Sequence, residues 1–512
     1  MVVVDSMHTA SMNGVHRPGV QAPARRCSMG GEAAVDWFVA EDYGLARVVL
    51  QRGVALLYVV AFVAVLRQFP ALLGERGLLP VPRFTARVPA RAAPSLFHWR
   101  YSDRLLRVVA WTGLALALAV VVGLPQQGPP WVPMLVFLAL YGLYLSVVNV
   151  GQVFYGFGWE SLLLEAGFLA AFLGSDQVGT PWITLIAFRW LLVRVELGAG
   201  LIKLRGDPAW RDLTALHYHH ETQPMPGPLS WFFHHLPGPL HKVEVAANHV
   251  TQLLVPVLLL APQPVATWAA GVVVVTQLWL VLSGNFAWLN WVTIVLAFSA
   301  VGDDVVSGLV PSLAPDRAYG PTPLWFAVVV AAVGLVMLVL SWWPARNLLS
   351  RRQRMNASFN AFHLMGAYGA FGSVTRRRDE IVVEGTRAAD PGEDDWEEYV
   401  FRGKPGPPGR LPRQFAPYHL RLDWGMWFLG LGSSAQLSWF LPFLDRLLEA
   451  DPDTLRLLAH DPFDGERPAW VRARVFRYRY STWEELRRER VWWVRREVGA
   501  LTAPRRLGRP RG

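Results

Sequence analysis

The chain of 512 residues has one cysteine and three lysines, and each scarcity excludes a class of function. Cys27 alone can form no intrachain disulfide and leaves no thiol pair for redox chemistry. Lysine is confined to positions 203, 242 and 404, so the net charge of +10 comes almost entirely from arginine, which lies beside hydrophobic segments. This distribution is typical of loops next to a membrane. We therefore expect no nucleic-acid partner.

Signatures of targeting and of cofactor chemistry are also missing. Residues 1–35 are rich in Gly, Pro, Ala and Ser and have no apolar core, so we expect a disordered tail and no cleavable signal peptide. The sequence contains no Walker loop, GxGxxG, CxxC, HExxH or serine nucleophile elbow. We therefore expect no bound cofactor and no metal.

Long apolar runs, in contrast, are abundant, and 53% of the residues are hydrophobic. Runs of about 18 residues or more predict membrane-spanning helices, with membrane lipids as partners. Segment 160–174 is short and either spans or re-enters, which gives eight or nine spans. We expect an amphipathic helix at 36–51 to precede the first span, which Pro and Gly should end. The candidate spans are 52–69, 105–124, 131–149, 160–174, 181–202, 247–262, 265–283, 286–301 and 323–343.

The character of the chain changes after this apolar part. Residues 355–512 contain four strand-like segments with Pro, Gly and acidic turns between them, which predicts a strand-rich α+β soluble domain. Residues 422–453 resemble a span interrupted by Gly, Ser and Gln, and we favour a helix pair packed on the sheet or on the membrane surface. The predicted architecture is therefore an all-α polytopic membrane bundle at 36–345, with a His-rich extramembrane segment at 204–246, followed by the soluble domain.

Ionisable residues inside the apolar helix 181–203 are the first candidate site. Arg189, Glu196 and Lys203 are seven residues apart and so share one helix face. Charges in hydrocarbon are costly unless they are paired, so the partners of this stripe should come from other helices. Two acids in the preceding apolar segment are the best available partners: Glu160 and Glu165.

Histidines between 217 and 249 form the second candidate site. Imidazole binds metals and transfers protons near neutral pH, but the spacing matches no known ligand set, so we favour a structural or partner-contact role. Proline interrupts this stretch, and its exposed aromatics at 231–233 suit a docking surface, an interfacial hairpin or a plug. The histidines are His217, His219, His220, His234, His235, His241 and His249.

Two asparagines lie in apolar surroundings near the end of the bundle. Asn285 and Asn290 must bond to neighbouring helices if they are buried. Capping the following helix is the simpler interpretation of Asn285. The Gly-rich LGAGL within 197–201 is expected to permit close helix packing.

Several of these segments together resemble one known family. SVVNVGQVFYGFGWESLLLE, KLRGDPAWRDLT, ETQPMP and SGNFAWLNW in the membrane part, with GAYGAFGSVTRRRDEIVVEGT and DDWEEYVFRGKPG in the tail, are similar to the lipase maturation factor family over about residues 36–500. The resemblance implies a polytopic protein, of the endoplasmic reticulum membrane in animals, that helps dimeric secreted lipases reach an active state. It places a client-contact or structural site at His219, Glu221, Thr222, Gln223, Pro224, Met225 and Pro226.

The same resemblance leaves two functions open. The membrane part is more distantly similar to vitamin K-dependent carboxylase-like bundles, which implies an enzyme acting on a lipid or peptide, with Arg189, Glu196, Lys203, His219 and Glu221 as candidate catalytic residues. We favour a non-enzymatic maturation factor for a secreted lipase or other client, located in the cell membrane if the source is bacterial. The thiol chemistry suggested for animal members is excluded here, because the only cysteine lies in the tail. The remaining candidate residues then bind or support structure: Glu160, Glu165, Arg194, Gln223, Pro224, Met225, Pro226, His234, His235, His249, Asn285 and Asn290.

Overall fold

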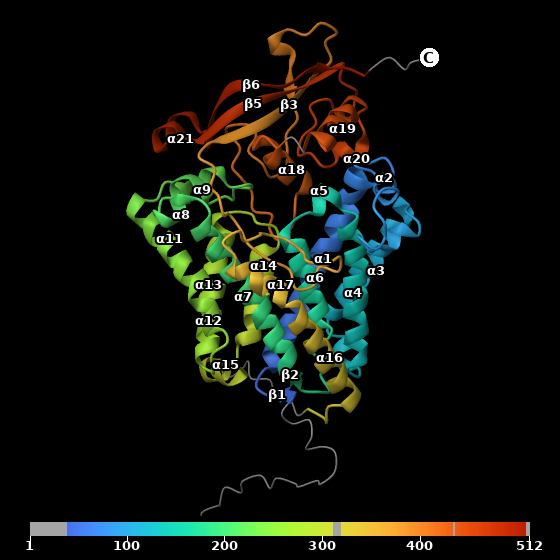
Figure 1. Ribbon diagram of the computed structural model, residues 1–512. Coiled ribbons are helices and arrows are strands. Elements are labelled where there is room, and N and C mark those ends of the chain that lie inside the picture. The colour runs from blue at the N-terminus through green and yellow to red at the C-terminus, as the bar shows by residue number, and fades with distance from the viewer. Residues whose placement is uncertain (1–37, 311–318, 434–435, 508–512) are drawn as a thin grey trace, which may run out of the picture.

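The computed structural model describes residues 38–310, 319–433 and 436–507. Long helices run side by side in a bundle, and a smaller region that contains a sheet covers one end (Figure 1). The predicted tail at 1–35 lies outside the described residues.

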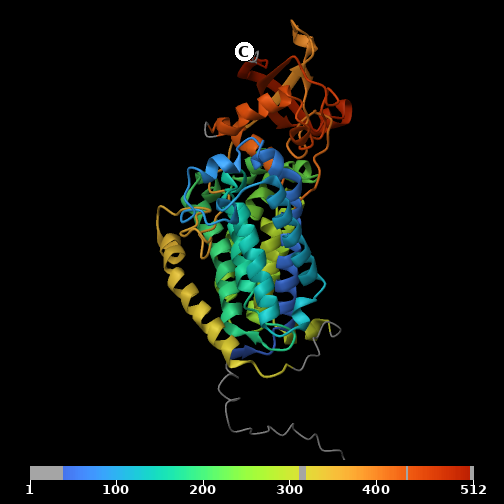
Figure 2. The ribbon, with the colours of Figure 1, turned by 90° about the vertical axis from the view of Figure 1, so that its right-hand side faces the viewer.

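Within the described residues, five helices are long and apolar enough to cross a membrane. They are α1 (Gly44–Leu73), α3 (Asp103–Val121), α4 (Trp131–Asn149), α13 (Val265–Ser283) and the consecutive α16 (Leu324–Leu340) and α17 (Trp342–Leu349). A sixth span results if α14 (Leu289–Ala297), with the short turn after it, is joined to α15 (Asp303–Leu309), although these two helices meet at a 98° bend. Helix α16 leans along the outside of the bundle (Figure 2).

The other predicted spans also contain helices, but these are more charged or shorter than the five helices given above. They are α6 (Gly158–Ala170), α7 (Trp182–Arg205), and α11 (Gly238–Leu253) followed by α12 (Val255–Leu258). Helix α7 runs the length of the bundle and contacts α6, α11, α14 and α16. Its central position explains why it tolerates charged side chains, since neighbouring helices surround them.

The start of the bundle differs from the prediction. Instead of an amphipathic lead-in and a separate span, α1 is one helix of 30 residues that passes through Pro70 and ends at Leu73, with Gly74 as its C-cap. Proline near the end of a helix removes a single hydrogen bond, so the last turn survives. The residues just before it form β1 (Val39–Ala40), which pairs with β2 (Thr180–Pro181). Two-residue strands have no periodicity, so the sequence did not predict this contact.

The C-terminal region confirms the predicted strands. An antiparallel sheet has the order β4-β3-β5-β6, formed by β3 (Arg378–Thr386), β4 (Glu397–Glu398), β5 (Trp470–Tyr480) and β6 (Trp493–Arg505). The segment that could pass for a span is instead a helix pair, α18 (Arg421–Gly430) and α19 (Leu437–Leu448), packed against β3 and β5. Short helix α21 (Trp483–Glu489) joins β5 to β6.

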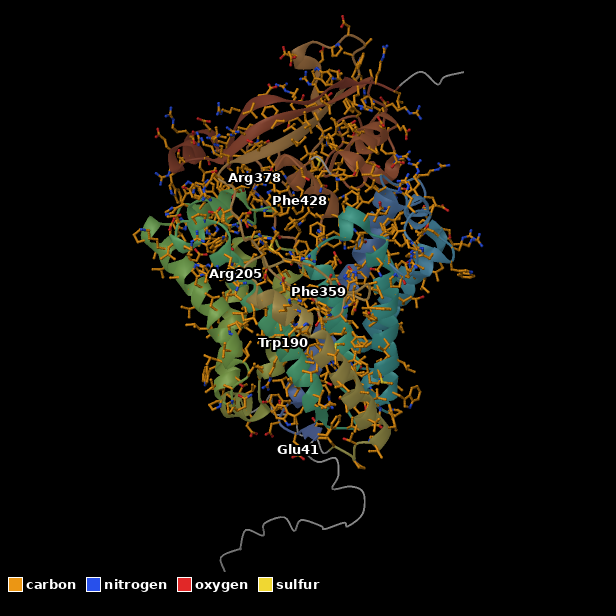
Figure 3. The ribbon with its side chains drawn as sticks, in the orientation of Figure 1. Glu41, Trp190, Arg205, Phe359, Arg378 and Phe428 are labelled. Atoms are coloured by element: carbon orange, nitrogen blue, oxygen red, sulfur yellow. The ribbon has the colours of Figure 1, made fainter. Side chains whose placement is uncertain are left out.

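The His-rich segment folds at the end of the bundle that carries the C-terminal sheet, as Figure 1 shows. It forms α8 (Pro208–Arg211), α9 (Leu216–Thr222) and α10 (Ser230–His234) before entering α11. Residues 350–377 connect α17 to the sheet along the same end. Arg378 and Phe428 mark the junction between the two parts of the molecule (Figure 3).

Candidate functional site

Two buried acids on α6 hold different parts of the molecule. Glu165 is paired with Arg194 of α7, through a 3.2 Å bond from Nη1 to Oε2 and a shorter contact to the other oxygen. It also accepts a hydrogen bond from the Tyr368 hydroxyl at 2.8 Å. Arg194 in turn donates to the Gly366 carbonyl at 2.8 Å. This group therefore fixes the 350–377 segment against the bundle.

Glu160, one turn earlier on α6, meets the C-terminal region instead. Its Oε1 accepts a 2.7 Å bond from Arg421 Nη1, with His419 Nδ1 at 3.4 Å. Its Oε2 accepts from the Tyr144 hydroxyl. Glu160, His419 and Arg421 are completely buried. Arg421 and His419 were missed by the sequence reasoning, because an isolated Arg and His in a soluble segment give no signal that they enter a membrane bundle.

The predicted ionic stripe on α7 is correct in principle and wrong in its partners. Arg189, Glu196 and Lys203 are buried and meet groups from other elements, but neither Glu160 nor Glu165 serves them. Arg189 lies toward the far end of α7 and donates to the Ser299 carbonyl at 3.0 Å. Seven-residue spacing places side chains on one face, but about 10 Å apart along the axis, so each finds its own partner.

Glu196 and Lys203 belong to a chain of polar groups between α7, α11, α13 and α14. Gln277 donates to Glu196 Oε1 at 2.7 Å and accepts from Asn290 at 2.7 Å. Lys203 Nζ donates to Gln252 Oε1 at 2.9 Å and to Asn248 Oδ1 at 2.8 Å. The prediction that Asn290 bonds to a neighbouring helix is therefore confirmed.

These polar groups line one wall of a cavity of about 740 Å³. The cavity lies between the bundle and the C-terminal region, with α18 contributing three aromatic side chains, and is otherwise mostly apolar. Its ionisable lining includes Glu196, Lys203 and His219. Aromatic side chains surround them: Phe157, Trp159, Trp210, Trp279, Phe286, Phe371, Trp424, Trp427 and Phe428. Such a pocket suits an apolar ligand with a small polar group.

Burial sets the protonation of His219 on the cavity wall. Removal from solvent lowers the pKa of His219 to about 3, and the neighbouring His220 and Lys203 act in the same direction. His219 is therefore neutral near pH 7. Its ring packs edge-on against Phe371, with ring centroids 4.8 Å apart. A neutral imidazole among aromatic rings can accept or donate one proton but carries no charge for binding an anion.

The ETQPMP segment, residues 221–226, is largely buried and connects α9 to α10. Arg378 from β3 donates to the backbone carbonyls of Glu221 at 3.0 Å and Pro224 at 3.1 Å. Gln223 donates to three oxygens, among them the Ser283 carbonyl at 2.8 Å. Met225, Pro224 and Pro226 are buried with it. These contacts are those of a structural element whose side chains are turned inward.

Glu221 and the histidines beyond it contact the C-terminal sheet. Tyr480 donates its backbone N–H to Glu221 Oε2 at 2.9 Å, and burial raises the pKa of Glu221. His234 Nε2 lies 3.8 Å from the same carboxylate. His235 bonds to the Trp231 carbonyl at 2.8 Å. The segment therefore binds this chain's own C-terminal region.

Asn285 and His249 likewise form hydrogen bonds with backbone groups of other segments. The capping interpretation of Asn285 is wrong, because α14 begins four residues later and its N-cap, Trp288, has no side-chain bond. Asn285 instead accepts 2.9 Å bonds from the amides of Phe415 and Ala416 and donates to the carbonyls of Pro226 and Arg413. It thus joins three segments far apart in the sequence. His249 bonds to the Trp210 carbonyl at 3.0 Å.

The fold and the site together define an integral membrane protein with a helical bundle and a C-terminal sheet domain. Buried ion pairs and hydrogen bonds of side-chain amides join the two parts, and a cavity lies between them. Comparison with protein families gives its class. Residues 45–308 match the lipase maturation factor transmembrane domain, and residues 364–503 match the lipase maturation factor C-terminal domain. The chain belongs to the lipase maturation factor family.

Similar proteins extend over nearly the whole chain. Lipase maturation factor 1 of Bos taurus is 39% identical over 91% of this chain and 90% of its own length, and that of Homo sapiens is 38% identical over 90% and 88%. Lipase maturation factor 2 of Gallus gallus is 28% identical over 87% and 79%. The comparison with solved structures gave no match.

Proposed function

We propose that this protein assists the folding or maturation of a secreted lipase or a related protein client at a membrane surface. The observation that carries the proposal is the similarity to proteins named lipase maturation factor 1 along about 90% of both chains, covering the bundle and the C-terminal domain together. The fold supports a binding role, because the two parts share one buried junction rather than a mobile linker.

The client surface that we propose lies where α10 meets the C-terminal domain. Trp231 is completely buried there and donates to the Ser481 carbonyl at 3.0 Å. Phe232 and Trp483 remain 42% and 47% exposed, with ring centroids 6.2 Å apart. Exposed aromatics on a rigid support are typical of surfaces that hold a protein partner. We call Phe232 and Trp483 the aromatic patch.

We also propose that all nine helical segments lie in the membrane, including α6, α7, α11–α12 and α14. The polar partners found for every charged residue from Arg189 to Lys203 support this placement, since paired charges are tolerated in hydrocarbon. The C-terminal domain and the 204–246 segment then face the same compartment. We place the protein in the cell membrane if the source is bacterial, and in the endoplasmic reticulum membrane if it is animal.

Client capture tests the proposal. Tagged full-length protein, cross-linked in intact cells and purified in detergent, should recover a secreted lipase or hydrolase identified by mass spectrometry. Phe232→Ser combined with Trp483→Ser should lose it. Trp99→Ser is the matched control, because Trp99 is 88% exposed and lies outside the aromatic patch. The proposal fails if no secreted hydrolase is recovered, or if the double variant recovers as much as the control.

A membrane-embedded enzyme of the carboxylase-like class is the alternative. It is favoured by the meeting of Glu196, Lys203 and His219 at one cavity. Arg189 and Glu221 lie elsewhere and drop out of its catalytic set. Lys203→Met and Glu196→Gln should then abolish client modification without reducing client recovery. If they leave maturation unchanged, the cavity has no catalytic role.

A further inference from the structure

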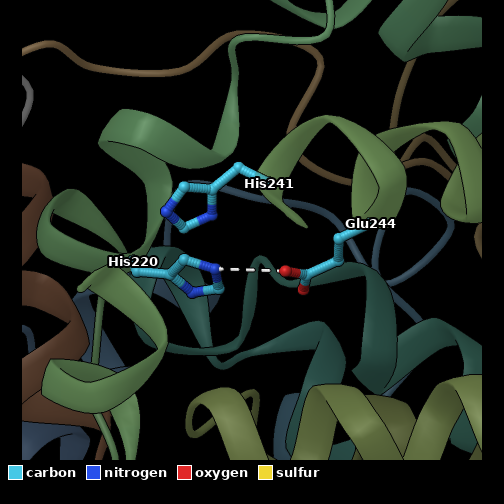
Figure 4. A group of neighbouring side chains, drawn as sticks. All are labelled: His220, His241 and Glu244. Atoms are coloured by element: carbon cyan, nitrogen blue, oxygen red, sulfur yellow. Dashed lines mark ion pairs between the residues drawn. The ribbon is translucent and has the colours of Figure 1, made fainter. Parts of the chain in front are cut away.

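Two helices of the His-rich segment present pairs of metal-binding side chains to each other. His217 and His220 are three residues apart on α9, and His241 and Glu244 are three residues apart on α11, so each pair shares a helix face. One atom from each of His220, His241 and Glu244 lies within 4.8 Å of the other two. Figure 4 shows the two rings and the carboxylate facing a common space.

The hydrogen bonds around this group leave one ligand atom free on His241 and one on Glu244. His241 Nε2 lies 3.3 Å from the His234 carbonyl, so this nitrogen carries the proton and Nδ1, which has no partner, offers its lone pair. Glu244 Oε1 accepts from Trp279 Nε1 at 2.7 Å, while Oε2 has no hydrogen bond. Metal ligands are commonly oriented in this way, by a bond to the atom that does not touch the metal.

His220 completes the set. Its side chain is 1% exposed, and neither ring nitrogen has a hydrogen bond. Its Nε2 lies 3.7 Å from Glu244 Oε2. Buried imidazole nitrogens without partners are rare, because the hydrogen bonds to water that they lose on burial are not replaced. A cation between the three side chains would bind one nitrogen of His220 together with His241 Nδ1 and Glu244 Oε2.

We propose that His220, His241 and Glu244 bind a divalent transition metal of the zinc class. Two imidazoles and one carboxylate are donors that Zn²⁺ accepts, and two neutral rings with one carboxylate suit its charge. Ligand atoms around tetrahedral zinc stand ~3.3 Å apart, as follows from metal–ligand distances of about 2.0–2.1 Å. The ligand atoms, which lie within 4.8 Å of one another, therefore need to approach by up to about 1.5 Å, which side-chain rotation can supply. Water takes the fourth position.

The metal would fix the ETQPMP segment to the bundle. His220 is followed directly by Glu221, whose carboxylate binds the Tyr480 amide of the C-terminal sheet. Helix α11 supplies the other two ligands and also Asn248 and Gln252, which hold Lys203. Metal binding would thus join the cavity wall, the ETQPMP segment and the C-terminal domain.

Metal content of the purified full-length protein tests the proposal directly. Protein expressed with added zinc should contain about one zinc ion per chain by mass spectrometry, and His241→Gln and Glu244→Gln should lose it. His249→Gln is the matched control, a half-buried histidine of the same segment outside the trio. Zinc content that is negligible in the wild type, or equal in wild type and ligand variants, overturns the proposal.

A second measurement on the wild type does not depend on whether the ligand variants fold. Chelator-treated wild type titrated with Co²⁺ should develop the visible absorption of a tetrahedral site, and its thermal midpoint should rise when metal is restored. Trp279→Phe removes the bond that orients Glu244 without removing a ligand, so it should weaken Co²⁺ binding about 10- to 100-fold. The absence of any Co²⁺ band in the folded wild type would contradict the site.

Discussion

Removing Arg421 should separate the C-terminal domain from the bundle. Its guanidinium is completely buried, bonds to Glu160 and to the Phe154 carbonyl at 2.7 Å each, and lies 3.4 Å from the Tyr155 ring centroid. Breaking a buried pair by removing one partner leaves an uncompensated charge and costs about 3–5 kcal/mol. We therefore expect Arg421→Met to destabilise the junction by that amount.

The rate of proteolysis at the junction measures this effect. Cleavage follows the population of the opened state, and every 1.4 kcal/mol changes that population about tenfold, so Arg421→Met should be cut roughly a hundred to several thousand times faster than the wild type. Arg488→Met is the matched control, since Arg488 forms a solvent-exposed pair with Glu484 of the same helix. Such pairs contribute little, and we expect no measurable change.

A double-mutant cycle identifies the cause. Glu160→Gln alone leaves Arg421 buried without its counterion, whereas Glu160→Gln with Arg421→Met removes both charges. The double variant should therefore be more stable than the sum of the single losses by about 2–3 kcal/mol. If the two losses add to within about 0.5 kcal/mol, the ion pair does not hold the domains together.

Three further predictions concern packing and pH. Gly198→Ala places a Cβ in steric conflict with the Tyr368 carbonyl oxygen and should cost about 1–3 kcal/mol in detergent unfolding, whereas Gly142→Ala, with open space around it, should be neutral or stabilising. Trp231→Ala empties a completely buried site and should lose about 3–5 kcal/mol of junction stability in the same proteolysis assay. Burial lowers the pKa of His363 below 6.5, so its contribution to stability is complete above that pH and falls as the medium is acidified, by up to about 1.4 kcal/mol per pH unit. His363→Gln should therefore show a smaller drop in thermal midpoint between pH 7 and pH 5.5 than the wild type, and an unchanged drop would contradict the assignment.

Local pattern was sufficient to predict elements but not the partners of their side chains. Helices occur at every range predicted as a span, and the four strands of the C-terminal sheet fall in the segments predicted to be strand-like. Four charged residues of α7 are buried, as the cost of charge in hydrocarbon requires: Arg189, Arg194, Glu196 and Lys203. Where each charge finds its partner depends on how helices distant in sequence are arranged, and periodicity carries no such information.

The candidate site shows the same limit. Glu196, Lys203 and His219 do meet at one cavity, as the enzyme hypothesis required, but Arg189 lies at a different helix contact. The amides that complete the polar wall were missed, because Gln and Asn within apolar helices are individually unremarkable. Gln252 gains its role because α11 packs beside α7, and Gln277 because its side chain reaches Glu196 from α13.

Helix α6 connects the membrane bundle both to the 350–377 segment and to the C-terminal domain. Glu165 fixes the 350–377 segment through Tyr368, and Glu160 fixes the C-terminal domain through Arg421. The same α18 that begins with Arg421 places Trp424, Trp427 and Phe428 at the cavity. An opening of the cavity on this side would have to move α18, and so break the Glu160–Arg421 pair. Opening of the cavity on this side and undocking of the domain are therefore coupled through Arg421 and α18.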